Sequence, residues 1–267
     1  MPSLTTRART GLLLAAAATL LTTGALHPAT ASAASAPAGT PAHATAAVLD
    51  LDGTGRSPVV HGEDTAYDTA SIVKVDILAA VLLQAQDAGR ELTAQERAHA
   101  EPMIKQSDNA AADALWRQIG QADGLAAANK RLGLTSTTSD PGGRWGLTRT
   151  TAGDQIRLLR AVFDGDADGT AAKTGASALS TGSRAYISTL MSQVVPEQSW
   201  GVSAAGSRQA LKNGWLQRVT SGLWDVNSIG QVTVNGHRYL VVVLSNGSAS
   251  MAEGVSLVER TARAAIA

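Results

Sequence analysis

Residues 72–83 are apolar at nearly every position, and only Lys74 and Asp76 interrupt the stretch. A helix that is apolar on almost every side has no face left for solvent, so this pattern predicts a buried central helix. The helix is expected to begin at Ser71 and to end at Gly89, which places Lys74 one turn after Ser71 on the same face. Because an ammonium is costly to bury, Lys74 must find acceptors or lose its proton.

Ser71 and Lys74 admit two interpretations. A desolvated lysine one turn from a serine can take the hydroxyl proton, and the N–H groups at a helix N-terminus can stabilise an oxyanion. The same spacing is also a common helix start, in which the serine caps the helix and the lysine reaches toward solvent. The pair alone does not decide between catalysis and capping.

Alternating and helical periods elsewhere predict the remaining elements. Residues 44–51 and 58–60 are expected to form a strand pair around a turn at 52–55. Capping residues and glycines delimit helices at 93–104, 109–119, 122–132, 155–163 and 183–194, the first with a Thr93–Glu96 capping box. After Trp200 the period becomes that of strands, at 211–215, 221–229, 231–234 and 239–245, with a two-residue turn at 235–236. An amphipathic helix at 251–265 closes the chain.

This order of elements predicts an α+β fold. The first and last strands are expected to join one antiparallel sheet, with the terminal helix on one face and a helical lobe beside it. The predicted domain covers residues 44–267, with a sheet lobe at 44–68 and 200–267 and a helical lobe at 69–199. A site would lie in the cleft between them.

The first 33 residues have the pattern of a secretory signal peptide. Arg7 and Arg9 precede a Leu/Ala-rich segment at 11–26, and A-x-A cleavage patterns follow at 31–33 and 34–36. Residues 34–43 are then a low-complexity leader. The chain has no cysteine, which excludes a lipoprotein anchor and disulfides, so we expect an exported protein without a membrane anchor.

Charge argues against polyanionic partners. Without Arg7 and Arg9 the chain carries 20 basic and 22 acidic residues, a net charge of about −2. This balance gives no electrostatic reason to expect nucleic acid or an anionic membrane as a partner.

Three short motifs carry the candidate chemistry: Ser71-x-x-Lys74 at the buried helix, Ser107-Asp108-Asn109 at a break between helices, and Lys212-Asn213-Gly214 at a late strand. In this order they resemble the S-x-x-K, S-D-N and K-T-G signatures of class A β-lactamases and penicillin-binding proteins. The resemblance extends over essentially the whole chain after the leader. It implies an acyl-serine hydrolase, with class A as the most similar branch.

The resemblance assigns roles to the motif residues. It implies that Ser71 is the nucleophile, that Lys74 accepts its proton, and that Ser107 passes a proton to the leaving nitrogen. Asn109 would hold the substrate amide, and Lys212, in the motif with Asn213 and Gly214, would supply a positive field for a substrate carboxylate. The backbone N–H groups of Ser71 and Leu216 would form the oxyanion hole.

The chain departs from the family pattern in its third motif. Asn213 stands in place of the threonine, whose hydroxyl binds the substrate carboxylate in the family, so this hydroxyl is absent here and substrate choice is expected to differ. A literal Lys173-Thr174-Gly175 also occurs, but no strand pattern surrounds it, so Lys212-Asn213-Gly214 is the expected functional copy.

A second departure concerns deacylation. Class A enzymes carry a glutamate in the loop after the S-D-N helices that activates the hydrolytic water. Here the loop at 135–148 has no glutamate, and its one carboxylate is Asp140. Either Lys74 serves both steps, or Asp140 replaces the glutamate, or hydrolysis of β-lactams is not the function.

We therefore expect a secreted, monomeric serine hydrolase that acts on a β-lactam or a related amide or ester. The alternatives are a D,D-peptidase and a slow-turnover module that binds penicillin or a cell-wall ligand. No cofactor or metal is expected, because the five histidines lack ligand spacing and the Asp/Gly-rich turn at 164–169 lacks the final glutamate of a calcium loop. Trp145 and Trp215 are expected to line the cleft.

Overall fold

The computed structural model describes residues 42–54, 57–164 and 178–267. The predicted signal peptide and most of the leader lie outside these ranges, as do Lys173-Thr174-Gly175 and all of the 164–169 turn except Asp164. Within the described ranges, no helix has both the length and the apolar character needed to cross a membrane.

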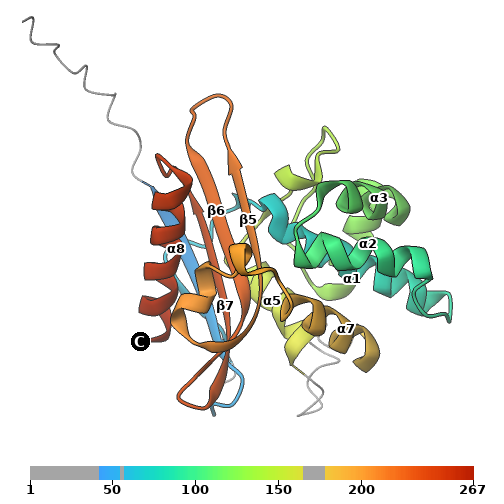
Figure 1. Cartoon of the computed structure of the whole chain (residues 1–267), viewed down its shortest axis with the longest axis horizontal. Coiled ribbons are helices and arrows are strands. Elements are labelled where there is room, and N and C mark those ends of the chain that lie inside the picture. The colour runs from blue at the N-terminus through green and yellow to red at the C-terminus, as the bar shows by residue number, and fades with distance from the viewer. Residues whose placement is uncertain (1–41, 55–56, 165–177) are drawn as a thin grey trace, which may run out of the picture. The chain divides into compact units, whose positions relative to one another are not determined.

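A five-stranded antiparallel sheet, in the order β2-β1-β7-β6-β5, joins the two ends of the domain (Figure 1). This arrangement confirms the predicted α+β class. Its strands are β1 (His43–Asp50), β2 (Val59–His61), β5 (Ser207–Gln217), β6 (Trp224–Val234) and β7 (His237–Asn246). A separate two-stranded sheet pairs β3 (Tyr67–Asp68) with β4 (Arg149–Thr150).

The prediction of two strands at 221–229 and 231–234 was wrong, because both belong to the single strand β6. Gly230, which suggested a break, pairs with Leu211 within a continuous register. A Cβ at Gly230 would collide with the Ala210 carbonyl oxygen, so the glycine marks close packing between β5 and β6.

The helices are α1 (Val73–Asp87), α2 (Ala94–Lys105), α3 (Asn109–Ile119), α4 (Gln121–Leu132), α5 (Ala152–Phe163), α7 (Thr181–Met191) and α8 (Met251–Ile266). A 3-10 turn, η1 (Ala70–Ile72), precedes α1, so the α-helix begins two residues later than predicted. Twelve of the fifteen residues of α1 are buried, as its apolar pattern predicts.

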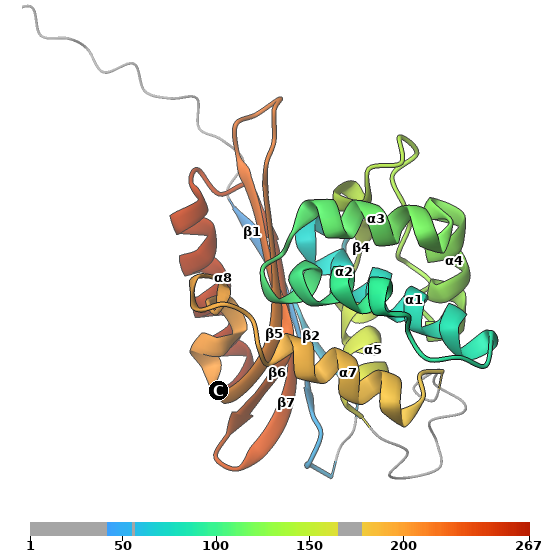
Figure 2. The same cartoon turned by 45° about the vertical axis from the view of Figure 1, so that its right-hand side comes forward.

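The helices cover the two faces of the sheet unequally. The helix α8 packs on one face, and α5 and the rest of the helical lobe lie on the other (Figures 1 and 2). Successive side chains of β7 point to opposite faces of the sheet. Val241 and Val243 join the core beneath α8, whereas Leu240 and Val242 join the core of the helical lobe.

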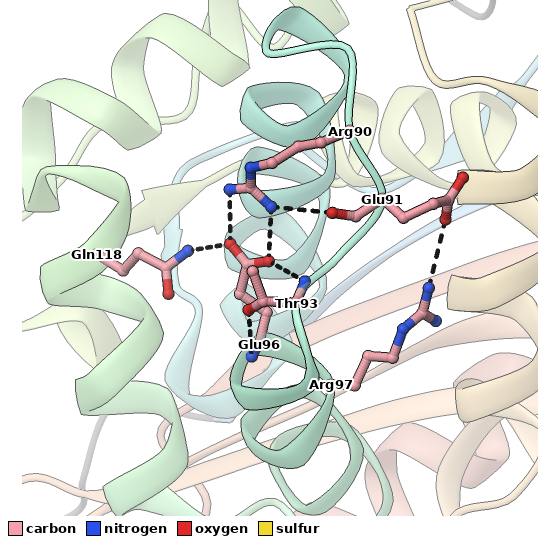
Figure 3. A network of polar contacts seen from close by, with 6 residues as sticks. All are labelled: Arg90, Glu91, Thr93, Glu96, Arg97 and Gln118. Carbon is pink, nitrogen blue, oxygen red and sulfur yellow. Dashed lines mark hydrogen bonds and ion pairs between the residues drawn. The ribbon is translucent and has the colours of Figure 1, made fainter.

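The predicted capping box of α2 is present. Thr93 Oγ1 accepts from the Glu96 N–H at 3.1 Å, and a Glu96 carboxylate oxygen accepts from the Thr93 N–H at 2.6 Å. Figure 3 shows that the same carboxylate also accepts two hydrogen bonds from the Arg90 guanidinium, at 2.8 and 2.9 Å, and one from the Gln118 side-chain amide of α3. Glu96 therefore ties the start of α2 to the neighbouring helix.

Candidate active site

The turn that carries Ser71 is held by hydrogen bonds from two sides. Its first residue, Ala70, has φ +47°, a left-handed conformation that costs energy for a residue with a side chain. The Thr69 N–H donates to the Thr148 carbonyl at 2.8 Å, and the buried amide of Asn227 on β6 donates to the carbonyls of Asp68 and Thr69 at 2.8 and 3.1 Å. These bonds fix the backbone on which Ser71 lies.

The edge strand β5 approaches this turn closely at Gly214. A Cβ on Gly214 would lie 2.7 Å from the Ser71 nitrogen and 2.8 Å from the Ile72 nitrogen. Glycine is thus required at this position by the contact between strand and turn.

Lys74 is fully buried and fully hydrogen-bonded. Its Nζ donates to the Ser107 carbonyl at 2.7 Å, to Ser107 Oγ at 3.0 Å and to Asn109 Oδ1 at 2.8 Å. Burial lowers its pKa to about 8, against the opposing effect of the Asp108 and Asp113 carboxylates. An amine of this pKa is available as a proton acceptor near neutral pH.

In the Ser107-Asp108-Asn109 motif, the side chain of Asp108 caps a helix, whereas those of Ser107 and Asn109 face the site. Asp108 is the N-cap of α3 and accepts from the Ala111 N–H at 2.7 Å. Ser107, with φ +58°, turns the chain so that its own side chain and that of Asn109 reach Lys74.

Lys212 meets the other two motifs from the sheet. Its buried Nζ donates to Ser107 Oγ at 2.9 Å and to the Asn213 carbonyl at 2.9 Å. Burial, followed by the charge of Lys74, lowers its pKa well below the ordinary value. The structure therefore brings together Lys74, Ser107, Asn109 and Lys212, and Ser71, three residues before Lys74, lines a pocket with Asn109.

Asn213 does not join this group. Its amide nitrogen donates to the carbonyls of Gln198 and Trp200, both at 2.9 Å, in the segment of η3 (Pro196–Gln198) and η4 (Gly201–Ala205). These two bonds hold the segment against the sheet, and the expected role of Asn213 in substrate binding stays a prediction.

The Leu216 N–H does not face Ser71. Arg218 donates its N–H to the Leu223 carbonyl on the β6 side at 2.8 Å. Alternate residues of an antiparallel strand direct their backbone groups to the same side, so Leu216, which pairs with Asp225, also directs its N–H toward β6. The N–H of Trp215 points to the free edge of β5, where η1 packs. The expectation that the Leu216 N–H faces the Ser71 turn was therefore wrong, and the β5 residue whose N–H lies on that side is the preceding one, Trp215.

A pocket of about 300 Å³ opens over Ser71. Trp145, in the 3-10 turn η2 (Trp145–Leu147), and Trp215 line it as expected, together with Ala70, Asn109, Arg144 and Leu216. Asp140, considered above as a deacylating base, instead binds the Arg144 side chain at 2.9 and 3.2 Å, and this interaction lowers the pKa of Asp140.

Two contacts at the site were not predicted. The Trp145 ring centroid lies 4.9 Å from Lys74 Nζ, and the indole Nε1–H donates to Asp113 Oδ1 at 2.7 Å. Asp113 lies one turn after Asn109 on α3, and this spacing was the available signal that it faces the site. No sequence pattern indicated that Asn227 supports the Ser71 turn.

Fold and site together define a protein of the β-lactamase/transpeptidase-like serine hydrolase class. Residues 83–267 match the model of the beta-lactamase enzyme family, which is more than half of the chain. The chain belongs to this family.

Solved structures show the same fold. An acyl-enzyme complex of a PBP-A variant with penicillin G is 22% identical, with a TM-score of 0.65, over 83% of this chain and 88% of that one. A class A β-lactamase from Bacteroides cellulosilyticus is 16% identical, with a TM-score of 0.66, over 84% and 92%.

Among curated proteins, the putative lipoprotein LppW of Mycobacterium tuberculosis is 34% identical over 123 residues, and that of Mycobacterium bovis matches equally. The match covers 46% of this chain and 39% of the relative, so it extends over well under half of the relative's length.

Proposed function

We propose that the protein is an exported acyl-serine hydrolase that forms a covalent ester at Ser71 with a β-lactam or a related amide or ester. The observation that carries the proposal is the set of hydrogen bonds around Lys74. A buried amine of lowered pKa, held by Ser107 and Asn109 one helical turn from Ser71, is the arrangement that nucleophilic catalysis requires.

Acylation follows from these positions. Lys74 Nζ takes the Ser71 hydroxyl proton as Oγ attacks the substrate carbonyl carbon. The N–H groups of Ser71 and Trp215 stabilise the negative charge that develops on the carbonyl oxygen. As the carbon–nitrogen bond breaks, Ser107 donates its proton to the leaving nitrogen and takes in return the proton that Lys74 Nζ received from Ser71. The acyl group then remains as an ester on Ser71.

Two further side chains bind or polarise the substrate. Asn109 accepts from Lys74 through Oδ1, so its amide N–H₂ remains to donate to a substrate carbonyl. Lys212 supplies a positive field at Ser107. The hydroxyl that binds a substrate carboxylate in the family is absent here, because Asn213 replaces it and turns away.

A second candidate is a penicillin-binding protein or D,D-peptidase with slow deacylation. It is favoured by the absence of a glutamate at 135–148 and by the engagement of Asp140 with Arg144. In either case we propose a small-molecule or cell-wall substrate, a monomer, and no cofactor.

Export is part of the proposal. It is supported by the basic and apolar segments and A-x-A patterns within residues 1–36, and by the lipoprotein name of the mycobacterial relatives. Recovery of the natural chain only from the cytoplasm, with residues 1–33 still attached, would contradict it.

The test of the enzymatic proposal is the intact mass of the protein after mixing with benzylpenicillin, sampled from seconds to hours, beside Ser71→Ala. A persistent adduct on the wild type alone supports the slow-turnover candidate. A transient adduct with loss of penicillin supports a β-lactamase. Absence of both adduct and penicillin loss counts against β-lactam substrates, and an adduct on Ser71→Ala rules out Ser71 as the nucleophile.

A further inference from the structure

Trp145 lies between two elements of the site. The ring contacts Lys74 Nζ of α1, and the indole N–H donates a hydrogen bond to Asp113 of α3. The ring therefore lies beside the amine at one end and is oriented by a carboxylate at the other.

The surroundings of Lys74 leave no opening for water. An ammonium has three donors, and three acceptors from Ser107 and Asn109 satisfy them at 2.7 to 3.0 Å. The indole lies within 4.9 Å of Nζ, and no part of the Lys74 side chain is exposed. Ser71, in contrast, is partly exposed and lines the open pocket. The nucleophile is thus open to a substrate, whereas the amine has no surface exposed to solvent.

The loop that carries Trp145 is anchored on both sides of the ring. Before it, Asp140 binds Arg144 at 2.9 Å. After it, Thr148 accepts from Thr69 at 2.8 Å, and Arg149 pairs with Thr138 through two backbone bonds of 2.8 Å. These contacts hold the indole in place over Lys74.

We propose that Trp145 is a cover over Lys74 that excludes hydrolytic water and so prolongs the life of an ester at Ser71, with Asp113 as the residue that positions the indole. This inference rests on the proposed function. It assigns to this site a trapping role in which acylation is fast relative to hydrolysis.

The step that the cover slows is deacylation. A water oxygen would attack the ester carbonyl carbon while one water proton passes to Lys74 Nζ. The bond from that carbon to Ser71 Oγ would then break, Oγ would recover the proton from Nζ, and a carboxylic acid would leave. The attacking water must lie within hydrogen-bond reach of both the ester and Nζ, and the proposal places it where the indole now borders Nζ.

The first experiment measures the lifetime of the adduct. The protein is acylated with benzylpenicillin, freed of excess reagent, and followed by intact mass. We expect Trp145→Ala to shorten the lifetime by about tenfold or more and Trp145→Phe, which keeps a ring over Lys74, to shorten it less. Trp116→Phe, a matched loss of an indole in the core of the same lobe, should leave it unchanged. Circular dichroism of the isolated adducts over the same period shows that they stay folded, so that a loss of stability is not mistaken for loss of the cover.

Asp113 is tested by a conservative and a disruptive variant. Asp113→Asn retains an oxygen that can accept from the indole N–H and should keep the long lifetime. Asp113→Ala frees the indole and should shorten it. A lifetime in Trp145→Ala equal to that of the wild type, or equal shortening in Asp113→Asn and Asp113→Ala, would overturn the assignment.

A second experiment does not depend on acylation. Labelling of lysines by acetic anhydride, read by peptide mass, should modify Lys74 of Trp145→Ala about tenfold faster than Lys74 of the wild type, relative to the exposed Lys130. Equal rates would overturn the cover even if an adduct forms. A wild type that never forms an adduct would instead refute the proposed function, while this labelling would still decide whether Trp145 covers Lys74.

Discussion

Lys74 and Lys212 donate to the same atom, Ser107 Oγ, at 3.0 and 2.9 Å. A hydroxyl oxygen has two lone pairs, and both are used here, so the Ser107 proton can be directed only outward to a further acceptor. Two buried ammonium groups on one oxygen also repel each other, and this lowers the pKa of Lys212 further after burial. The arrangement poises Ser107 as a proton donor and favours a neutral amine at one of the two lysines.

The first prediction concerns Lys74. Lys74→Ala should abolish acylation by benzylpenicillin while the protein stays folded, because the proton acceptor for Ser71 is lost. In the wild type, the neutral amine is the active form and increases with pH, so the acylation rate should rise with a midpoint near the Lys74 pKa of about 8. Single-turnover acylation measured from pH 6 to 10 tests this. Unchanged labelling of Lys74→Ala, or a flat pH profile, would refute the role of Lys74.

The second prediction concerns the contact between β5 and the Ser71 turn. Gly214→Ala should reduce the acylation rate by about a hundredfold, because the new Cβ would lie 2.7 Å from the Ser71 nitrogen and displace the nucleophile. Gly182→Ala is the control, since the nearest atom to its Cβ is Ser180 Oγ at 3.9 Å. Equal acylation rates for the two variants would show that the contact does not position Ser71.

The third prediction separates Asp140 from deacylation. Asp140→Asn should change the adduct lifetime by no more than about twofold, because the carboxylate binds Arg144 and its lowered pKa makes it a poor base. Decay of the isolated adduct is the measurement. A strongly prolonged adduct in Asp140→Asn would identify Asp140 as the deacylating base after all.

The fourth prediction concerns a carboxyl group in the middle of α1. Asp76 is fully buried, and burial raises its pKa to about 7, while the polar groups of its own backbone and of Gln155 oppose the shift. In the unfolded chain this group ionises near pH 4, so between pH 4 and 7 the folded state holds a proton that the unfolded state has lost. Stability should fall over this window as pH rises, by an amount on the order of 3 to 4 kcal/mol.

Asp76→Asn cannot ionise and should lose this dependence, so its stability relative to the wild type should be greater at pH 8 than at pH 4. Urea unfolding at the two pH values measures the difference. Parallel pH dependence in both proteins would mean that Asp76 does not hold a proton in the folded state.

The fifth prediction concerns Glu96. Its interaction with Arg90, followed by the Thr93 and Gln118 hydrogen bonds, lowers its pKa to about 2. The stabilisation is therefore complete above about pH 4.5 and is lost as pH falls toward 2. Glu96→Gln should cost about 2 kcal/mol at pH 7, after allowance for the half-exposed Arg90, and little near pH 2.

Glu101→Gln on the same helix is the matched control for Glu96, since the Glu101–Lys105 pair is on the surface. It should change the free energy of unfolding by less than about 0.5 kcal/mol at either pH. A cost for Glu96→Gln that is the same at pH 7 and pH 2 would contradict the assigned ionisation.

Local patterns predicted much of the fold and several members of the site. The apolar run of α1, the Thr93 cap of α2 and the strand at 239–245 depend on residues near in sequence, and the structure has them as predicted. Motif order also indicated that Lys74, Ser107, Asn109 and Lys212 would lie together.

The features that the sequence did not predict correctly depend on strand register and on contacts between residues far apart in the chain. Whether Trp215 or Leu216 directs its N–H to Ser71 is decided by the pairing of β5 with β6, and a change of one residue reverses the answer. The orientation of Asn213 depends on carbonyls of the segment before β5, and that of Trp145 depends on Asp113 of α3. Of these partners only Asp113 has a local signal, its spacing of one turn from Asn109.

The bonds from Asn227 to Asp68 and Thr69 span 159 and 158 positions of the chain. A chain that has been made only as far as the helical lobe already contains the serine and its lysine, yet the turn beneath the serine lacks its support from β6. We therefore expect any reactivity of Ser71 to be acquired late, when the final third of the polypeptide folds back onto the first. A chain truncated before β6 should then fail to react at Ser71 at all, and not merely react slowly.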